Sequence, residues 1–197
     1  MTGYLIAFEG LDQSGKQTQA ERLTAYLRAL GRDVRTTSFP EYETTIGQEI
    51  GRALAGERPY GPDVMQLLYV ANRYERKNDL EEWIGTGAII VSDRYTASSI
   101  AYGEALGLDP VWLTDMQRYL PPADVTILLD IAPETAVARK ITDRDRYERD
   151  IEMQARVRQS YHRQAKAAGW VMLNGERDKS VVAADVVNAI SSRLGLR

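Results

Sequence analysis

The sequence predicts an α/β fold, in which a five-stranded parallel sheet carries helices on both faces. Short apolar, β-rich runs of the buried parallel type recur along the 197-residue chain. Stretches with a helical spacing of apolar residues separate these runs, and this alternation is typical of a doubly wound sheet. No repeat or linker interrupts the pattern, so residues 1–197 are expected to form a single domain.

The elements of the N-terminal half are bounded by glycine and proline. A strand over 4–9 precedes a helix over 17–30, which Gly31 ends, and Pro40 ends a second strand over 33–39. Pro62 suits the first turn of a long helix, and the run A-I-I-V-S is a third, buried strand. The predicted helices here are one ending near residue 55, one at 63–78 and one at 80–84, and the third strand is 88–92.

The C-terminal half continues the alternation. Pro121 and Pro122 break the chain before a fourth strand at 125–131, and a fifth short strand follows at 170–173. Amphipathic spacing predicts the helices between and after these strands. They cover residues 96–106, 110–120, 133–140, 151–168 and 180–194.

The first strand leads into a glycine-bounded loop with P-loop spacing. Glycine has no Cβ, so the backbone amides can turn inward, and with the positive end of the next helix they form a pocket for phosphate. The Lys16 ammonium can reach the β- and γ-phosphates of a triphosphate. The alternative is a glycine-rich turn that only joins strand to helix. The expected nucleotide-binding residues are Gly10, Leu11, Asp12, Gln13, Ser14, Gly15, Lys16, Gln17 and Thr18.

Composition narrows the function classes. A net charge of −3 argues against general nucleic-acid binding. The chain has no cysteine, which excludes disulfides and thiolate metal sites and fits a cytoplasmic protein. Its single histidine, His162, cannot form a multi-histidine metal site and is expected at the surface. No apolar run is long enough to span a bilayer, and the immediate start of a core strand predicts no signal peptide.

The C-terminal ends of parallel strands are where ligands gather. This rule places the loop at 10–17, the segments 39–41 and 93–95, and the strand end near Asp130 at one edge. Asp93 follows a buried strand, as the Mg²⁺-organising acid of P-loop enzymes does; the alternative is an N-cap of the next helix. Arg94 could bridge two phosphates, or be a surface ion-pair partner.

Two further groups suggest a second ligand. Tyr69 and Arg73 lie four residues apart and share a helical face, where a ring could stack on a nucleobase and a guanidinium could bind its carbonyl. The alternative is a core tyrosine beside a rim arginine. Residues 139–149 are rich in arginine and aspartate, and form either a solvated face or a lid that closes over the γ-phosphate.

Together these stretches resemble the thymidylate kinase family, the P-loop enzymes that phosphorylate dTMP, over nearly the whole chain. The matching segments are G-L-D-Q-S-G-K at 10–16, F-P-E at 39–41, T-I-G at 45–47, L-L-Y-V-A-N-R-Y-E at 67–75, D-R-Y at 93–95, S-S-I-A-Y at 98–102 and R-Y-E at 146–148 with Gln154.

The resemblance implies a P-loop kinase fold, a lid at about 140–150, and roles for single residues. ATP is held by Lys16 and the loop amides, and Mg²⁺ by Asp93. Arg94 bridges the phosphates, and an arginine of the lid is catalytic, with Arg144 the first candidate and Arg139 the second. The residues implied for dTMP are Asp12, Phe39, Pro40, Tyr69, Arg73, Arg94, Ser98 and Tyr102. A homodimer is also expected, with no nucleic-acid or membrane partner.

The sequence departs from the family pattern at three positions. Gln17 replaces the metal-ligating Ser or Thr, while Thr18 lies about 100° further round the helix. We hypothesise that the Gln17 carboxamide contributes to the cation site. Ser38 replaces an arginine that grips the acceptor phosphate, and Ile100 stands where many bacterial relatives have a glutamine that reads the pyrimidine.

The reaction expected from these observations is ATP + dTMP giving ADP + dTDP. Two alternatives stay open from the sequence. One is a related nucleoside monophosphate kinase with another pyrimidine acceptor. The other is a nucleotide-binding regulatory protein with impaired catalysis, which the departures at Gln17 and Ser38 suggest.

Overall fold

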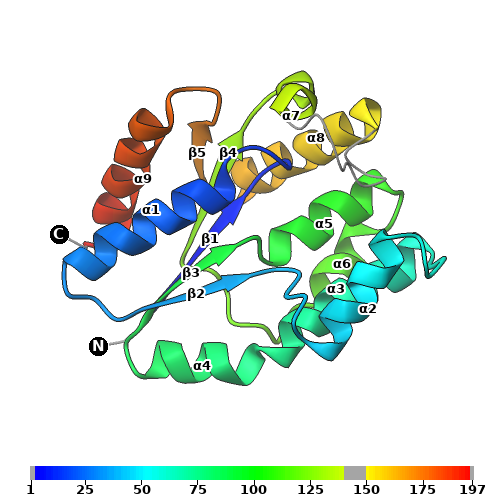
Figure 1. Ribbon diagram of the computed structural model, residues 1–197, viewed down its shortest axis with the longest axis horizontal. Coiled ribbons are helices and arrows are strands. Elements are labelled where there is room, and N and C mark those ends of the chain that lie inside the picture. The colour runs from blue at the N-terminus through cyan, green and yellow to red at the C-terminus, as the bar shows by residue number, and fades with distance from the viewer. Residues whose placement is uncertain (1–2, 140–149, 196–197) are drawn as a thin grey trace.

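A computed structural model describes residues 3–139 and 150–195 of the chain. At its centre is a parallel sheet with strand order β2-β3-β1-β4-β5, so β1 lies in the middle (Figure 1). The prediction of a five-stranded parallel sheet is confirmed. The strands are β1 (Tyr4–Glu9), β2 (Val34–Ser38), β3 (Ile89–Asp93), β4 (Val125–Asp130) and β5 (Val171–Asn174).

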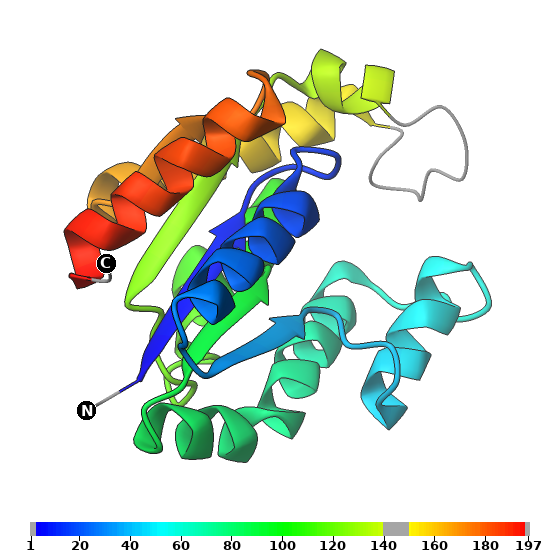
Figure 2. The same ribbon diagram turned by 60° about the vertical axis from the view of Figure 1, so that its left-hand side comes forward.

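Helices cover both faces of the sheet (Figure 2). Those of the described residues are α1 (Lys16–Ala29), α2 (Thr45–Leu54), α3 (Pro62–Glu75), α4 (Lys77–Gly85), α5 (Thr96–Ala105), α6 (Pro110–Asp115), α7 (Pro133–Arg139), α8 (Ile151–Ala168) and α9 (Lys179–Leu194). Helices α1 and α9 share one apolar cluster with the sheet, while α4, α5 and α8 pack on the opposite side. None of the helices within 3–139 and 150–195 is long and apolar enough to cross a membrane.

The central strand is buried on both faces, which explains its nearly continuous apolar run. Ile6 and Phe8 point into the cluster shared with α1 and α9, whereas Leu5 and Ala7 point into the cluster that contains α4. All four side chains are almost fully buried. This burial fixes the centre of the sheet and aims the C-terminal end of β1 at the glycine-bounded loop.

Three predicted helix boundaries are wrong. The short helix predicted over 80–84 is α4, which begins at Lys77, and two other predicted helices end earlier than expected. The helix predicted over 110–120 ends at Asp115, because the amides of Gln117, Arg118 and Leu120 donate to carbonyls three residues back and form tight turns. These turns bring Leu120 into the core beside α4. The helix predicted over 63–78 ends at Glu75, and Arg76, which pairs with Glu41, begins the turn into α4.

Candidate active site

Two cavities meet at the C-terminal ends of β1 and β3. The first has a volume of about 650 Å³ and is lined by residues 12–19 and 175–179, together with Asp93 and Arg139; we call it the loop cavity. The second has a volume of about 110 Å³ and aromatic walls; we call it the aromatic cavity. Asp12 and Arg94 line both, so the boundary between the two cavities runs through this pair.

The loop after β1 needs glycine where it turns. Gly10 has φ of 139°, and a Cβ there would lie 2.4 Å from the carbonyl oxygen of Leu129 on β4. Gly15 is the N-cap of α1 with φ of 93°, so the N-terminus of the helix opens toward the loop cavity. Residues 12–18 of the predicted nucleotide-binding stretch line this cavity, whereas Gly10 and Leu11 are buried and do not line it.

Lys16 is held inside the loop cavity. Its ammonium donates to the carbonyl of Leu11 at 2.8 Å. Burial lowers the pKa of Lys16 to about 8, and Arg94 lowers it too, while the carboxylates of Asp12, Asp93 and Glu9 oppose the change. An anion in the cavity would favour the charged ammonium, so Lys16 suits contact with a phosphate.

Asp12 and Arg94 form a partly buried ion pair at the boundary between the cavities. The guanidinium donates to one carboxylate oxygen of Asp12 at 2.5 Å, and Tyr102 donates to the other at 2.9 Å. Burial raises the pKa of Asp12, but the charges of Arg94 and Lys16 outweigh this effect and hold it well below its usual range. Arg94 also donates to the hydroxyls of Ser98 and Tyr161. Its guanidinium is therefore fixed where the ends of two ligands would meet.

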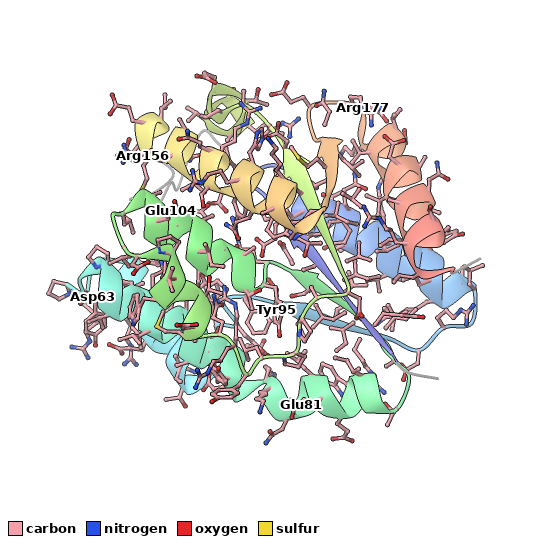
Figure 3. The ribbon with its side chains drawn as sticks, turned by 180° about the vertical axis from the view of Figure 1, so that it is seen from behind. Asp63, Glu81, Tyr95, Glu104, Arg156 and Arg177 are labelled. Carbon is pink, nitrogen blue, oxygen red and sulfur yellow. The ribbon has the colours of Figure 1, made fainter. Side chains whose placement is uncertain are left out.

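Glu9 supports this arrangement from below, although the sequence analysis did not single it out. It is fully buried at the end of β1, and one carboxylate oxygen accepts from the backbone amides of Tyr95 at 2.9 Å and Ser98 at 3.3 Å. The other oxygen accepts from the hydroxyls of Ser98 at 2.6 Å and Tyr161 at 3.0 Å. Figure 3 shows Tyr95 inside the molecule at the start of α5. The signal in the sequence that could have identified Glu9 is a single acidic residue at the end of an otherwise apolar strand.

Asp93 ends β3 in the wall of the loop cavity. The alternative that it caps the next helix is wrong, since Tyr95 is the N-cap of α5 and the Glu9 carboxylate accepts the hydrogen bonds from the backbone amides there. One carboxylate oxygen of Asp93 is buried and has no hydrogen-bond partner among the described residues. A carboxylate oxygen in this state fits a divalent cation, because hard cations prefer oxygen ligands. Gln17 lines the same cavity, and its amide nitrogen donates to Glu21 at 2.9 Å.

The aromatic cavity joins side chains from α3, α5 and the segment after β2. Arg73 is only 3% exposed and donates to the hydroxyl of Ser99 at 2.8 Å and the carbonyl of Tyr69 at 3.1 Å. Its guanidinium lies 5.7 Å from the ring centre of Phe39. Burial lowers the pKa of Arg73 to about 10, so it stays charged at neutral pH. The alternative of a rim arginine is therefore wrong, and the cavity suits a planar heterocycle with a polar edge.

Comparison with known proteins gives the family. The family model for thymidylate kinase matches residues 8–186. A thymidylate kinase of Arabidopsis thaliana is 37% identical over 172 residues, which are 87% of this chain and 65% of that protein. One of Plasmodium falciparum is 33% identical over 190 residues, covering 96% of this chain and 90% of that protein.

The chain belongs to the thymidylate kinase family. The resemblance inferred from sequence and the P-loop kinase fold are thus confirmed. The solved structure of thymidylate kinase from Candida albicans matches with a TM-score of 0.84 at 27% identity, and covers 100% of this chain and 94% of that one. Membership of the family makes this chain an ATP-dependent nucleoside monophosphate kinase.

Of the three positions that depart from the thymidylate kinase pattern, Gln17 lines one of the two cavities, whereas Ser38 and Ile100 line neither. Ser38 is exposed. Asp130, which the strand-edge rule placed near the site, instead pairs with Arg158 at 2.7 Å and His162 at 2.8 Å on α8. The partly exposed His162 is consistent with the prediction of a surface position.

The far wall of the loop cavity includes residues that sequence reasoning missed. Residues 175–179, which connect β5 to the first residue of α9, line it, and they include Arg177, which Figure 3 labels. Arg139 donates to the carbonyls of Gln13 and Gly175, each at 3.0 Å, and so links α7, the loop after β1 and this segment. Arg144 and the predicted lid at about 140–150 lie outside the described residues, apart from Asp150, which caps α8.

Proposed function

We propose that this chain transfers the γ-phosphoryl group of ATP to dTMP, giving ADP and dTDP. The observation that supports this most is the ion pair of Asp12 and Arg94, because both residues line the loop cavity and the aromatic cavity. One guanidinium therefore stands where the donor and acceptor phosphates would meet. Membership of the thymidylate kinase family supports the identity of both substrates.

The loop cavity is the donor site in this proposal. The amides of residues 10–18 and the Lys16 ammonium hold the ATP phosphates, because they combine a helix N-terminus with a buried cation. Arg139 borders the same cavity and neutralises charge on the phosphates. Arg144 remains our first candidate for the catalytic arginine of the lid, on the family resemblance alone.

The aromatic cavity is the acceptor site. Tyr69 stacks on thymine and the Arg73 guanidinium donates to a carbonyl on its edge. Tyr102 and Asp12 border the deoxyribose and its phosphate, and Ser98 positions Arg94 beside them. Phe39 and Pro40 complete the apolar wall.

The chemistry requires positioning and charge neutralisation rather than covalent catalysis. The acceptor oxygen already belongs to a phosphate anion at neutral pH, so no strong general base is needed. Arg94 remains protonated in this pH range, and its fixed position places positive charge between the two phosphates.

Mg²⁺ is the cation we propose for the donor site, held by Asp93 with Gln17 contributing its carboxamide oxygen or a bound water. The unpartnered carboxylate oxygen of Asp93 supports this assignment. Bound there with ATP, the cation would neutralise the phosphates. No group of three or more His, Asp or Glu residues in the described ranges forms a separate metal site. The Gln17→Ser variant should change the Mg²⁺ dependence of the rate; an unchanged dependence and rate would remove Gln17 from the site.

An acceptor panel tests the proposed function. ADP release is measured with dTMP, dUMP, UMP and thymidine, each with and without Mg²⁺. We expect dTMP to be the best acceptor and the rate to require the cation. Thymidine as the best acceptor, or ATP binding without turnover of any of the four, would overturn the proposal. The homodimer that the family resemblance implies is tested by measuring the molar mass of the purified protein by light scattering.

A further inference from the structure

We propose that Gln66 reads the base of the acceptor nucleotide and selects pyrimidines with an imide edge. The inference rests on the proposed function and assigns it a further specificity-determining residue. Gln66 lies on α3 and lines the aromatic cavity together with Tyr69 and Arg73 of the same helix. Its side chain is only 1% exposed, so the polar group belongs to the cavity wall and not to the surface.

The carboxamide of Gln66 has no hydrogen-bond partner among the residues that the structure describes. Its oxygen is buried and accepts no hydrogen bond from any residue within 3–139 or 150–195, and its nitrogen donates none to them. A buried polar group left unpaired is destabilising, whereas a ligand that pairs with it recovers this free energy on binding. The cavity thus offers an amide with which a polar ligand can pair.

Packing holds the stem of Gln66 in place. Gly103 of α5 lies directly behind it, and a Cβ at Gly103 would come within 3.3 Å of Gln66 Cγ. The same Cβ would collide with Leu113 of α6, so the two helices and Gln66 are close-packed at this point. A stem confined in this way presents its amide in one region of the cavity, which is what discrimination between bases requires.

The polar groups of the cavity match one type of base edge. The guanidinium of Arg73 can only donate, and its Nε is also buried without a partner among the described residues. A carboxamide offers an NH₂ group as donor and a carbonyl oxygen as acceptor. Thymine and uracil present a carbonyl oxygen beside a ring N–H, which pairs with Arg73 and with the acceptor of Gln66. Cytosine places an amino group where Arg73 requires an acceptor, and its ring nitrogen carries no hydrogen.

The Gln66→Met variant tests this contact by removing the amide at similar volume. We expect the dissociation constant of dTMP, measured by calorimetry, to rise about tenfold, which corresponds to about 1.4 kcal/mol. The kcat for dTMP should change less than about twofold, and the affinity for 2-deoxyribose 5-phosphate, which lacks the base, should stay the same. The matched control is Gln117→Met, which removes a buried glutamine outside both cavities and should leave both affinities unchanged.

Two results would overturn the proposal: an unchanged affinity for dTMP, or equal losses for dTMP and 2-deoxyribose 5-phosphate. If the variant does not fold, the side-chain amide resonances of Gln66 in the wild-type protein decide. They should shift on saturation with dTMP but not with 2-deoxyribose 5-phosphate, and shifts that are absent or equal refute the contact. A wild-type protein that fails to phosphorylate dTMP refutes the proposed function instead, and normal turnover with an unaffected variant refutes only the role of Gln66.

Discussion

Replacing Glu9 by glutamine should lower stability and activity together, because one buried carboxylate joins the start of α5 to α8. Its first oxygen accepts from two backbone amides, which cannot turn away, so the glutamine oxygen must take this position. The new NH₂ group then faces the hydroxyls of Ser98 and Tyr161. Both hydroxyls already receive a donor from Arg94, at 3.1 and 3.2 Å, so the added N–H groups crowd the network.

The size of the effect follows from the bonds that change. A hydrogen bond to a charged group contributes about 1.5–3 kcal/mol, and Glu9→Gln disturbs two of these bonds while weakening the other two. We expect a loss of about 3 kcal/mol in the free energy of unfolding. For a chain of 197 residues this lowers Tm by about 6–12 °C. A shift of Arg94 should reduce kcat by up to about 100-fold.

Urea unfolding, followed by circular dichroism, measures the loss of stability. The kcat at saturating dTMP measures the loss of activity. The matched control is Glu104→Gln, which makes the same change at the contact of α5 with α8, close to the labelled Arg156 in Figure 3. Glu104 lines neither cavity, so we expect a loss below about 1 kcal/mol and an unchanged kcat. A loss below about 0.5 kcal/mol in Glu9→Gln, or a loss no larger than in the control, would refute the reasoning.

Four further predictions concern the loop cavity and its boundary. KM for ATP should rise as pH increases through about 8, because the buried Lys16 ammonium loses its proton, and Lys16→Met should flatten this profile. Since the unfolded chain keeps the Lys16 proton up to about pH 10.5, this group should make stability increase from about pH 8 to 10.5, measured by urea unfolding. Arg94→Lys should lower kcat by about 100- to 1000-fold with little change in KM for ATP, because an ammonium cannot reproduce the fixed guanidinium, and steady-state kinetics measure this. Gly10→Ala should destabilise the fold by about 2–3 kcal/mol, because its Cβ would meet the carbonyl of Leu129, whereas Gly56→Ala, with positive φ but open space, should cost less in the same unfolding assay.

The parts of the site that the sequence predicted are those formed by neighbours in the chain. The glycine-bounded loop follows from spacing over a few residues, and the shared face of Tyr69 and Arg73 follows from one helical turn. The buried runs of β1 and β3 also predict that Asp12 and Asp93 lie at one edge, because parallel strands share a direction. Local geometry therefore predicts most of the P-loop and part of the aromatic cavity that we propose as the acceptor site.

The parts that the sequence could not predict depend on contacts between distant residues. Glu9 meets Tyr95, Ser98 and Tyr161, which lie 86, 89 and 152 residues further along the chain. Similarly, the segment at 175–179 reaches the loop cavity only because β5 pairs with β4, which lies next to β1 on the side opposite β3. Strand order decides such meetings, and periodicity within one element contains no information about it.

The charges of the site explain why its supporting residues matter as much as those that face ligands. Asp12, Asp93 and Glu9 stand close to Lys16 and Arg94, and each carboxylate favours the charged form of that buried lysine. Arriving phosphates add negative charge to a cluster that is already nearly balanced, so binding depends on where the cations stand rather than on a large positive surplus. The positions of these cations are set by hydrogen bonds from residues that do not face the ligands, above all those of the Glu9 carboxylate at the end of β1. A substitution that preserves every ligand-facing side chain but moves this support should therefore reduce catalysis, which is the outcome that Glu9→Gln puts to the test.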